Sequence, residues 1–187
     1  MPRQVFDFDP PERFVAGTTG PPGARTFFLQ ARSGTALTSV ALEKAQVSAL
    51  AERVEELLDE VVRRSGGAAP VPAVTPADAR DDAPLDTPIE EEFRVGTMTL
   101  AWDGERQLVV IECFEVGDDD GGEAALGGSA EEDPRSLLRV SLTGASARAF
   151  CSRALAVVAA GRPPCPFCGD PLDPAGHVCP RANGYRR

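Results

Sequence analysis

Hydrophobic positions recur with helical spacing in one early stretch of the chain. Between residues 47 and 62 the apolar residues follow one another at steps of three and one, which places them on one helix face. These residues are Val47, Leu50, Ala51, Val54, Leu57, Leu58, Val61 and Val62. Charged residues fill the positions between them, and Ser65, Gly66 and Gly67 follow. The pattern predicts an amphipathic helix of about 20 residues that ends near Ser65.

Segments with strand character lie on both sides of this helix. The expected strands cover residues 25–32, 35–42, 93–102, 107–116 and 135–142. Ser33-Gly34 and Asp103-Gly104 are turn signals, and each lies between two of these segments. A second helix, rich in small residues, is expected over 145–160, because Gly161 and two prolines follow it. We therefore predict an α+β fold with antiparallel sheet and two main helices.

The two halves of the chain share a pattern at an offset of 100 residues. Residues 38–53 and 138–153 have the same residue at five matched positions. These pairs are Val40/Val140, Leu42/Leu142, Ala45/Ala145, Ala49/Ala149 and Arg53/Arg153. Earlier in each half stand the similar segments 12–17 and 91–96. We hypothesise an internal duplication of a unit in which strands precede a helix, although Ala, Val, Leu and Arg are common enough to match by chance.

Composition divides the chain further. Residues 66–88 are rich in Pro, Ala and Asp and have no period, so they are expected to form a flexible linker. Residues 1–65 then form a first α/β half, and residues 89–162 a second half that packs with the first as one domain. Residues 163–187 form a separate C-terminal tail.

The charge of the chain limits its partners. Asp and Glu number 29 against 19 Lys and Arg, which gives a net charge of -10. Such a chain repels phosphate backbones and anionic lipid, so nucleic acid is an unlikely partner. No apolar run reaches the roughly 18–20 residues that span a bilayer, and the first residues do not resemble a signal peptide. We therefore expect a cytoplasmic protein without membrane association, whose thiols stay reduced; its oligomeric state is open.

The tail carries a metal-binding pattern. Cys165 and Cys168 form C-x2-C, and after eight residues His177 and Cys179 form H-x-C. Zinc prefers four tetrahedral ligands drawn from thiolate and imidazole, and Gly169 helps the first turn to close. We predict a structural, zinc ribbon-like Zn²⁺ site formed by these four residues, with no open position for water.

Free or redox-active thiols are the alternative to a zinc site. A thioredoxin-like C-x2-C begins a helix, whereas here two prolines precede Cys165 and Pro171 follows Cys168. Cys113 lies in an expected strand and Cys151 in an expected helix. These two cysteines are interpreted as small buried apolar side chains.

The tail also resembles a known family. Its sequence CPFCG, followed by PLDP, GHVCPR and NGYRR, is similar to an actinobacterial family of uncharacterised proteins defined as a domain of unknown function. The resemblance extends over most of the chain, including Phe6-Asp7-Phe8-Asp9-Pro10 and RTFFLQAR at residues 25–32. It implies a soluble bacterial protein and assigns no catalytic residue.

Three functions remain open from the sequence. The preferred one is a non-catalytic accessory protein that binds a protein partner. A nucleic-acid-binding protein would use the tail residues Arg181, Tyr185, Arg186 and Arg187. An enzyme would have to use carboxylates in the body, because the only histidine is expected to bind metal; the candidates are Asp7, Asp9, Glu112 and Glu115.

Overall fold

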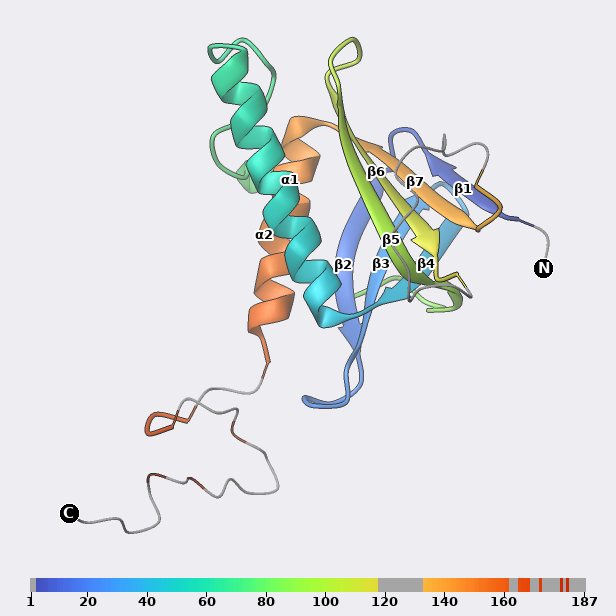
Figure 1. The fold of residues 1–187 in the computed structure, drawn as a ribbon, viewed down its shortest axis with the longest axis vertical. Helices are drawn as coiled ribbons and strands as arrows, with labels where there is room; N and C mark the ends of the chain where they lie inside the picture. Colours follow the sequence, from blue (N-terminus) through green and yellow to red (C-terminus); the bar gives the residue numbers. More distant parts are fainter. Residues whose placement is uncertain are drawn as a thin grey trace.

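One curved, mixed β-sheet forms the framework of the computed structural model (Figure 1). The structure describes residues 3–117, 133–161, 165–168, 172, 179 and 181. Its strands are β1 (Val5–Phe8), β2 (Arg13–Thr19), β3 (Thr26–Ser33), β4 (Ala36–Leu42), β5 (Glu91–Asp103), β6 (Leu108–Glu115) and β7 (Leu137–Leu142). The order across the sheet is β1-β7-β6-β5-β4-β3-β2. The pairs β1–β7 and β4–β5 are parallel, and the other neighbours are antiparallel.

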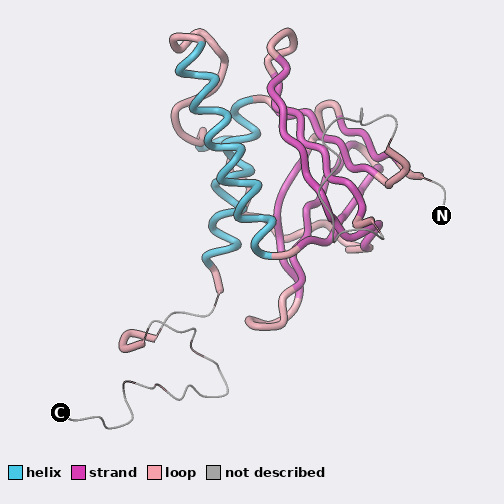
Figure 2. Tube along the Cα trace, viewed as in Figure 1, coloured by secondary structure: helices cyan, strands magenta, loops and turns pink. Residues whose placement is uncertain are grey.

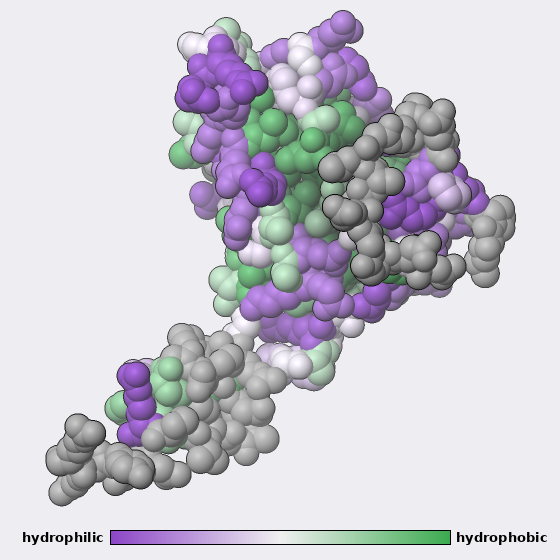
Figure 3. All heavy atoms as spheres, in the orientation of Figure 1, coloured by the Kyte–Doolittle hydropathy of each residue, from purple (hydrophilic) through white to green (hydrophobic). Residues whose placement is uncertain are grey.

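Two helices cover one face of this sheet and lie side by side (Figures 1 and 2). They are α1 (Lys44–Arg64) and α2 (Gly144–Ala159), and α2 also contacts the edge strand β2. The rings of Phe14 in β2 and Phe150 in α2 stack with centroids 4.8 Å apart. Figure 3 shows hydrophobic residues in the seam between α1 and the sheet, with hydrophilic residues along the outer side of α1. Burial of this interface drives the helices onto the sheet.

Each half of the chain repeats the same order of elements. Strands β2, β3 and β4 form an antiparallel meander followed by α1, and β5, β6 and β7 form another followed by α2. The corresponding boundaries fall 100 residues apart: β4 ends at Leu42 before the N-cap Glu43, and β7 ends at Leu142 before the N-cap Thr143. The matched positions found in the sequence thus occupy matched structural positions. Common ancestry of the halves stays a prediction.

Residues 66–90 follow a defined path between the halves. The segment passes α2 so closely that a Cβ on Gly144 would lie 2.9 Å from the carbonyl oxygen of Pro70. Farther along, a short 3-10 turn spans Ala77–Ala79, and Leu85 packs on the outer face of the sheet in a small second core. The other members of that core are Val15, Phe28 and Ala41, with Ile89 beside them. The segment expected to be a flexible linker therefore makes specific contacts with both halves.

The sequence predictions can be compared element by element. The α+β class and both helices are confirmed, and the buried residues of α1 belong to the predicted apolar stripe. The hairpin at Asp103 forms, with its side chain accepting hydrogen bonds from the backbone N–H groups of Glu105 and Arg106. Strands β1 and β2 were not among the expected strands. Neither α1 nor α2 combines the length and apolar character needed to cross a bilayer, and no other helix in the described part does.

Candidate metal centre and charged cleft

Three of the four predicted metal ligands come together in the tail. The Sγ atoms of Cys165, Cys168 and Cys179 all lie within 4.8 Å of one another. Cys165 and Cys179 are 4% and 7% exposed, although they belong to a segment with little apolar surface of its own. In a tetrahedral zinc site with Zn–S bonds of about 2.3 Å, neighbouring sulfurs are about 3.8 Å apart. A small movement would therefore let the three sulfurs share one ion.

A tight turn at Pro166–Cys168 creates this arrangement. The backbone N–H groups of Cys168 and then Phe167 donate hydrogen bonds to the Cys165 sulfur, which lower the pKa of Cys165 to about 6. The thiolate is thus favoured at neutral pH, and it is the form that binds metals. The turn is not a helix, so the geometry differs from that of a thioredoxin-like motif. The Arg181 guanidinium donates to the carbonyl of Phe167 at 3.2 Å, which links a residue just beyond Cys179 to the turn.

The remaining candidate ligands are either outside the described residues or buried in the body. His177, the predicted fourth ligand, lies outside the described residues, as do Tyr185, Arg186 and Arg187. Cys113 and Cys151 are buried in the body, and burial raises the pKa of each to about 12. None of the five cysteines forms a disulfide bond. The two body cysteines are therefore neutral apolar side chains, as predicted.

The carboxylates considered for catalysis are held in ion pairs or hydrogen bonds. Asp9 pairs with Arg106 at 2.6 Å, and this hydrogen bond lowers the pKa of Asp9. Glu112 pairs with Arg139 at 2.8 Å and also accepts from the hydroxyl of Thr99. Asp7 lies 3.7 Å from Arg139, and Glu115 accepts the backbone N–H of Ser136. A general acid needs a raised pKa, whereas ion pairs favour the charged carboxylate.

A cleft of about 670 Å³ lies at the free edge of the sheet. Its walls come from the start of strand β2, Arg32 of β3, the segment 78–86, and one face of α2. Charged side chains dominate the lining, with Phe14, Ala149 and Phe150 as apolar surface among them. Volumes of about 300–1,000 Å³ are typical of small-molecule sites.

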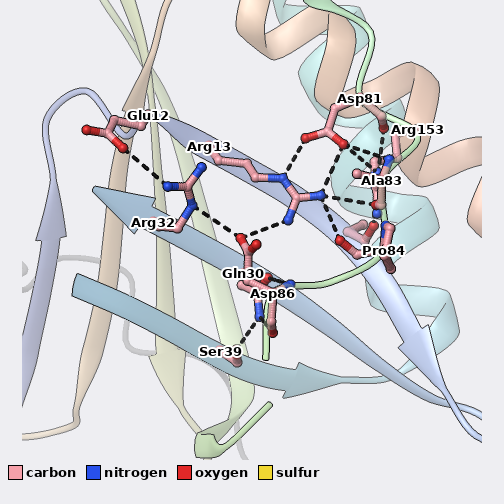
Figure 4. Close-up of polar contacts among 11 residues, drawn as sticks. Glu12, Arg13, Gln30, Arg32, Ser39, Asp81, Ala83, Pro84, Asp86 and Arg153 are labelled. Carbon is pink, nitrogen blue, oxygen red and sulfur yellow. Dashed lines mark hydrogen bonds and ion pairs between the residues drawn. The ribbon is translucent and has the colours of Figure 1, made fainter. Parts of the chain in front are cut away.

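A row of alternating charges crosses the cleft wall (Figure 4). Arg13 is central: its Nε lies 2.6 Å from Asp81 and its Nη1 lies 2.9 Å from Asp86. Asp81 also contacts Arg153 at 3.2 Å, while Asp86 contacts Arg32 at 3.2 Å. Arg13 lowers the pKa of Asp81, chiefly through the hydrogen bond. The row therefore fixes the segment 78–86 to the edge of the sheet.

Neutral contacts support the same attachment. The side-chain amide of Gln30 donates to the carbonyl of Asp86 at 3.0 Å and accepts the backbone N–H of Asp86 at 2.7 Å. Gln30 is 1% exposed and also donates to Ser39. It therefore gives an irregular segment the paired hydrogen bonds that a neighbouring strand would provide.

The cleft was not found by sequence reasoning. Asp81, Asp86 and Arg80 stand in a stretch whose composition indicates disorder, and Arg153 looks like an ordinary surface residue of a helix. One signal was present in the sequence. Arg13 directly precedes the apolar residues Phe14, Val15 and Ala16, and a charge there needs a partner if the strand is covered.

Comparison with known proteins gives a family and no function. No curated protein and no solved structure matches the chain. A family model described as protein of unknown function (DUF3090) matches residues 6–179, a span that includes the two halves, the cleft and the three clustered cysteines. The chain belongs to the DUF3090 family.

Proposed function

We propose that Cys165, Cys168 and Cys179, together with His177, bind one structural Zn²⁺ ion in a non-catalytic accessory protein. The observation that carries this proposal is the approach of three cysteine sulfurs to within 4.8 Å of one another. Thiolates are soft ligands that favour zinc over calcium or magnesium. Four protein ligands complete the zinc coordination and leave no position for a reactive water.

The role of such a site is to order the tail. The segment around the cysteines lacks a core, so metal binding would supply its folding free energy. Phe167 stands between two of the cysteines and is 63% exposed. A rigid metal-bound turn that presents an aromatic side chain is suited to contact with a protein partner, and we assign the partner surface to this turn. The proposal includes a cytoplasmic location, where thiols stay reduced and can bind the metal.

Metal analysis of the purified chain tests the zinc site. We expect one zinc per chain by inductively coupled plasma mass spectrometry. Cys168→Ser should lose the metal and make the tail sensitive to limited proteolysis, while the body keeps its thermal transition. Cys151→Ala is the matched control, because it removes a buried cysteine of the body and should keep the zinc. Wild-type protein without bound metal, after expression with added zinc, would refute the site.

The partner surface needs a separate test. Phe167→Ser should retain zinc and the fold, because the side chain is exposed, and should lose proteins that cross-link to the wild-type tail in native cells. Val74→Ser is the control, since Val74 is 75% exposed and belongs to the segment between the two halves rather than to the tail. Identical sets of cross-linked proteins for wild type and Phe167→Ser would contradict the assignment of this surface.

A further inference from the structure

The arginines of the charged cleft differ in how many donors they have left. Arg13 uses four of its five N–H donors, with contacts to Asp81 and Asp86 and hydrogen bonds to the carbonyls of Ala83 and Pro84. Its side chain is 10% exposed. Among the described residues, one Nη1 hydrogen of Arg13 has no acceptor, so Arg13 has at most one N–H left for a ligand. Arg13 is therefore a structural residue of the cleft wall.

Arg153 is different because it stands at the end of the row of charges. Its side chain is 11% exposed, and its Nε donates to the carbonyl of Ala16 on the free edge of β2. Its Nη1 donates to the backbone carbonyl of Asp81 and lies 3.2 Å from the Asp81 carboxylate, which already binds Arg13 through both oxygens. Within the described part of the chain its Nη2 has no acceptor, so two N–H donors remain in the cleft.

The charges around Arg153 also indicate that its guanidinium is incompletely paired. Burial lowers the pKa of Arg153, and the positive charge of Arg13 adds to that effect, so the attraction of Asp81 and Asp82 does not fully compensate. Buried cations are costly unless they are paired. An anion that entered the cleft would balance the remaining positive charge of Arg153 at this end of the row.

A second guanidinium lines the same cleft. Arg80 is exposed on the segment that forms the outer wall, and no described residue pairs with it. Glu12, Asp78 and Asp82 also line the cleft and would repel a ligand with many negative charges. Ala149 and Phe14 provide apolar surface. The lining therefore suits a small molecule with one acidic group and an apolar body.

We propose that this cleft binds a small organic molecule through a single oxyanion group, with Arg153 and Arg80 as the groups that recognise the anion. Guanidinium groups form paired hydrogen bonds with both phosphate and carboxylate, so either group satisfies the geometry. The body of the molecule packs on Phe14 and Ala149. The site is independent of the zinc tail and would make the protein a small-ligand binder as well.

Three probes with the same ring test the proposal on the full chain. Calorimetric titration with phenyl phosphate, benzoate and phenol compares two oxyanions with a neutral analogue. We expect binding of at least one of the two anions and a loss of at least tenfold in affinity for phenol. Tighter binding of phenyl phosphate assigns the site to phosphate esters, and tighter binding of benzoate assigns it to carboxylic acids. Failure of both anions to bind, or equal affinity for phenol, would overturn the proposal.

The variants locate the binding in the cleft. Arg153→Gln and Arg80→Gln should each weaken binding of the preferred anion by about tenfold or more. Arg53→Gln is a matched control, because Arg53 holds the equivalent position in α1 and is 74% exposed. Arg80 is exposed, so its replacement tests the site even if Arg153→Gln fails to fold. The assignment would be overturned if Arg80→Gln, like Arg53→Gln, left the affinity for the preferred anion unchanged.

Discussion

Replacing Arg13 by Gln should detach the segment 78–86 from the sheet. The substitution removes both ion pairs and the hydrogen bonds to the carbonyls of Ala83 and Pro84. It leaves Asp81 and Asp86 without their main cation, although Arg153 and Arg32 remain near them. Besides those two arginines, the segment would then rely on Leu85 and Gln30.

The size of the effect follows from burial. Breaking a fully buried ion pair costs about 3–5 kcal/mol. Asp81 and Asp86 are 30% and 38% exposed, so water can solvate them once Arg13 is gone. We therefore expect the free energy of unfolding to fall by about 2–3 kcal/mol, which for a chain of this length lowers Tm by about 5–10 °C. Arg13→Lys should lose most of the same stabilisation, because a lysine ammonium cannot make the several hydrogen bonds of the planar guanidinium.

Urea unfolding followed by the fluorescence of Trp102, the only tryptophan, measures this change. Hydrogen exchange should show faster exchange in residues 78–86 than in β3. Arg53→Gln is the comparison, since its ion pair with Glu56 is exposed and contributes under about 1 kcal/mol. A midpoint for Arg13→Gln that matches that of Arg53→Gln would refute the reasoning, because it would mean that the row of charges adds nothing to stability.

Three further outcomes follow from the same contacts. Arg13 lowers the pKa of Asp81 in the folded state. The stabilisation from this ion pair is therefore present above pH about 4 and is lost as the pH falls through the lowered pKa. Asp81→Asn should flatten the dependence of the urea midpoint on pH between about 5 and 2, and an unaltered slope would contradict this prediction. Leu85→Ala should cost about 2–3 kcal/mol in urea unfolding, because Leu85 is 9% exposed in the second core; a cost under about 0.5 kcal/mol would mean that the outer face does not need it. Gly144→Ala should lower Tm even though alanine favours helices, because its Cβ would meet Pro70 and Val71 at 2.9 Å; a raised Tm would show that the segment moves aside easily.

Local patterns could predict much of this fold. The helical period of α1 and the turn signals were sufficient because they depend on residues close in sequence. The cysteine spacing predicted which sulfurs would approach one another, because a C-x2-C turn has few conformations. The offset of 100 residues placed the two helix starts at equivalent positions, Glu43 and Thr143.

The parts that could not be predicted depend on contacts between distant residues. Strand β1 is four residues long and pairs with β7, more than 130 residues later in the chain. The parallel pairing of β4 with β5 joins the two halves through a segment without any period. Composition alone suggested that residues 66–88 could not bury enough surface to become ordered. The charges that hold the segment, Arg13 and Arg153, belong to other elements, so one sequence could not indicate the pairing.

The cleft lies where the two halves of the chain stop being equivalent. Each helix satisfies a carbonyl on a strand at the start of a meander: Gln46 of α1 donates to Val95 of β5, and Arg153 of α2 donates to Ala16 of β2. The donors differ because β5 is an interior strand, whereas β2 is the free edge and exposes its backbone. Arg53, the counterpart of Arg153, points to solvent instead. If the halves do share an ancestor, a repeated arginine was retained at both positions and acquired a buried role only at the sheet edge, where the connecting segment encloses it.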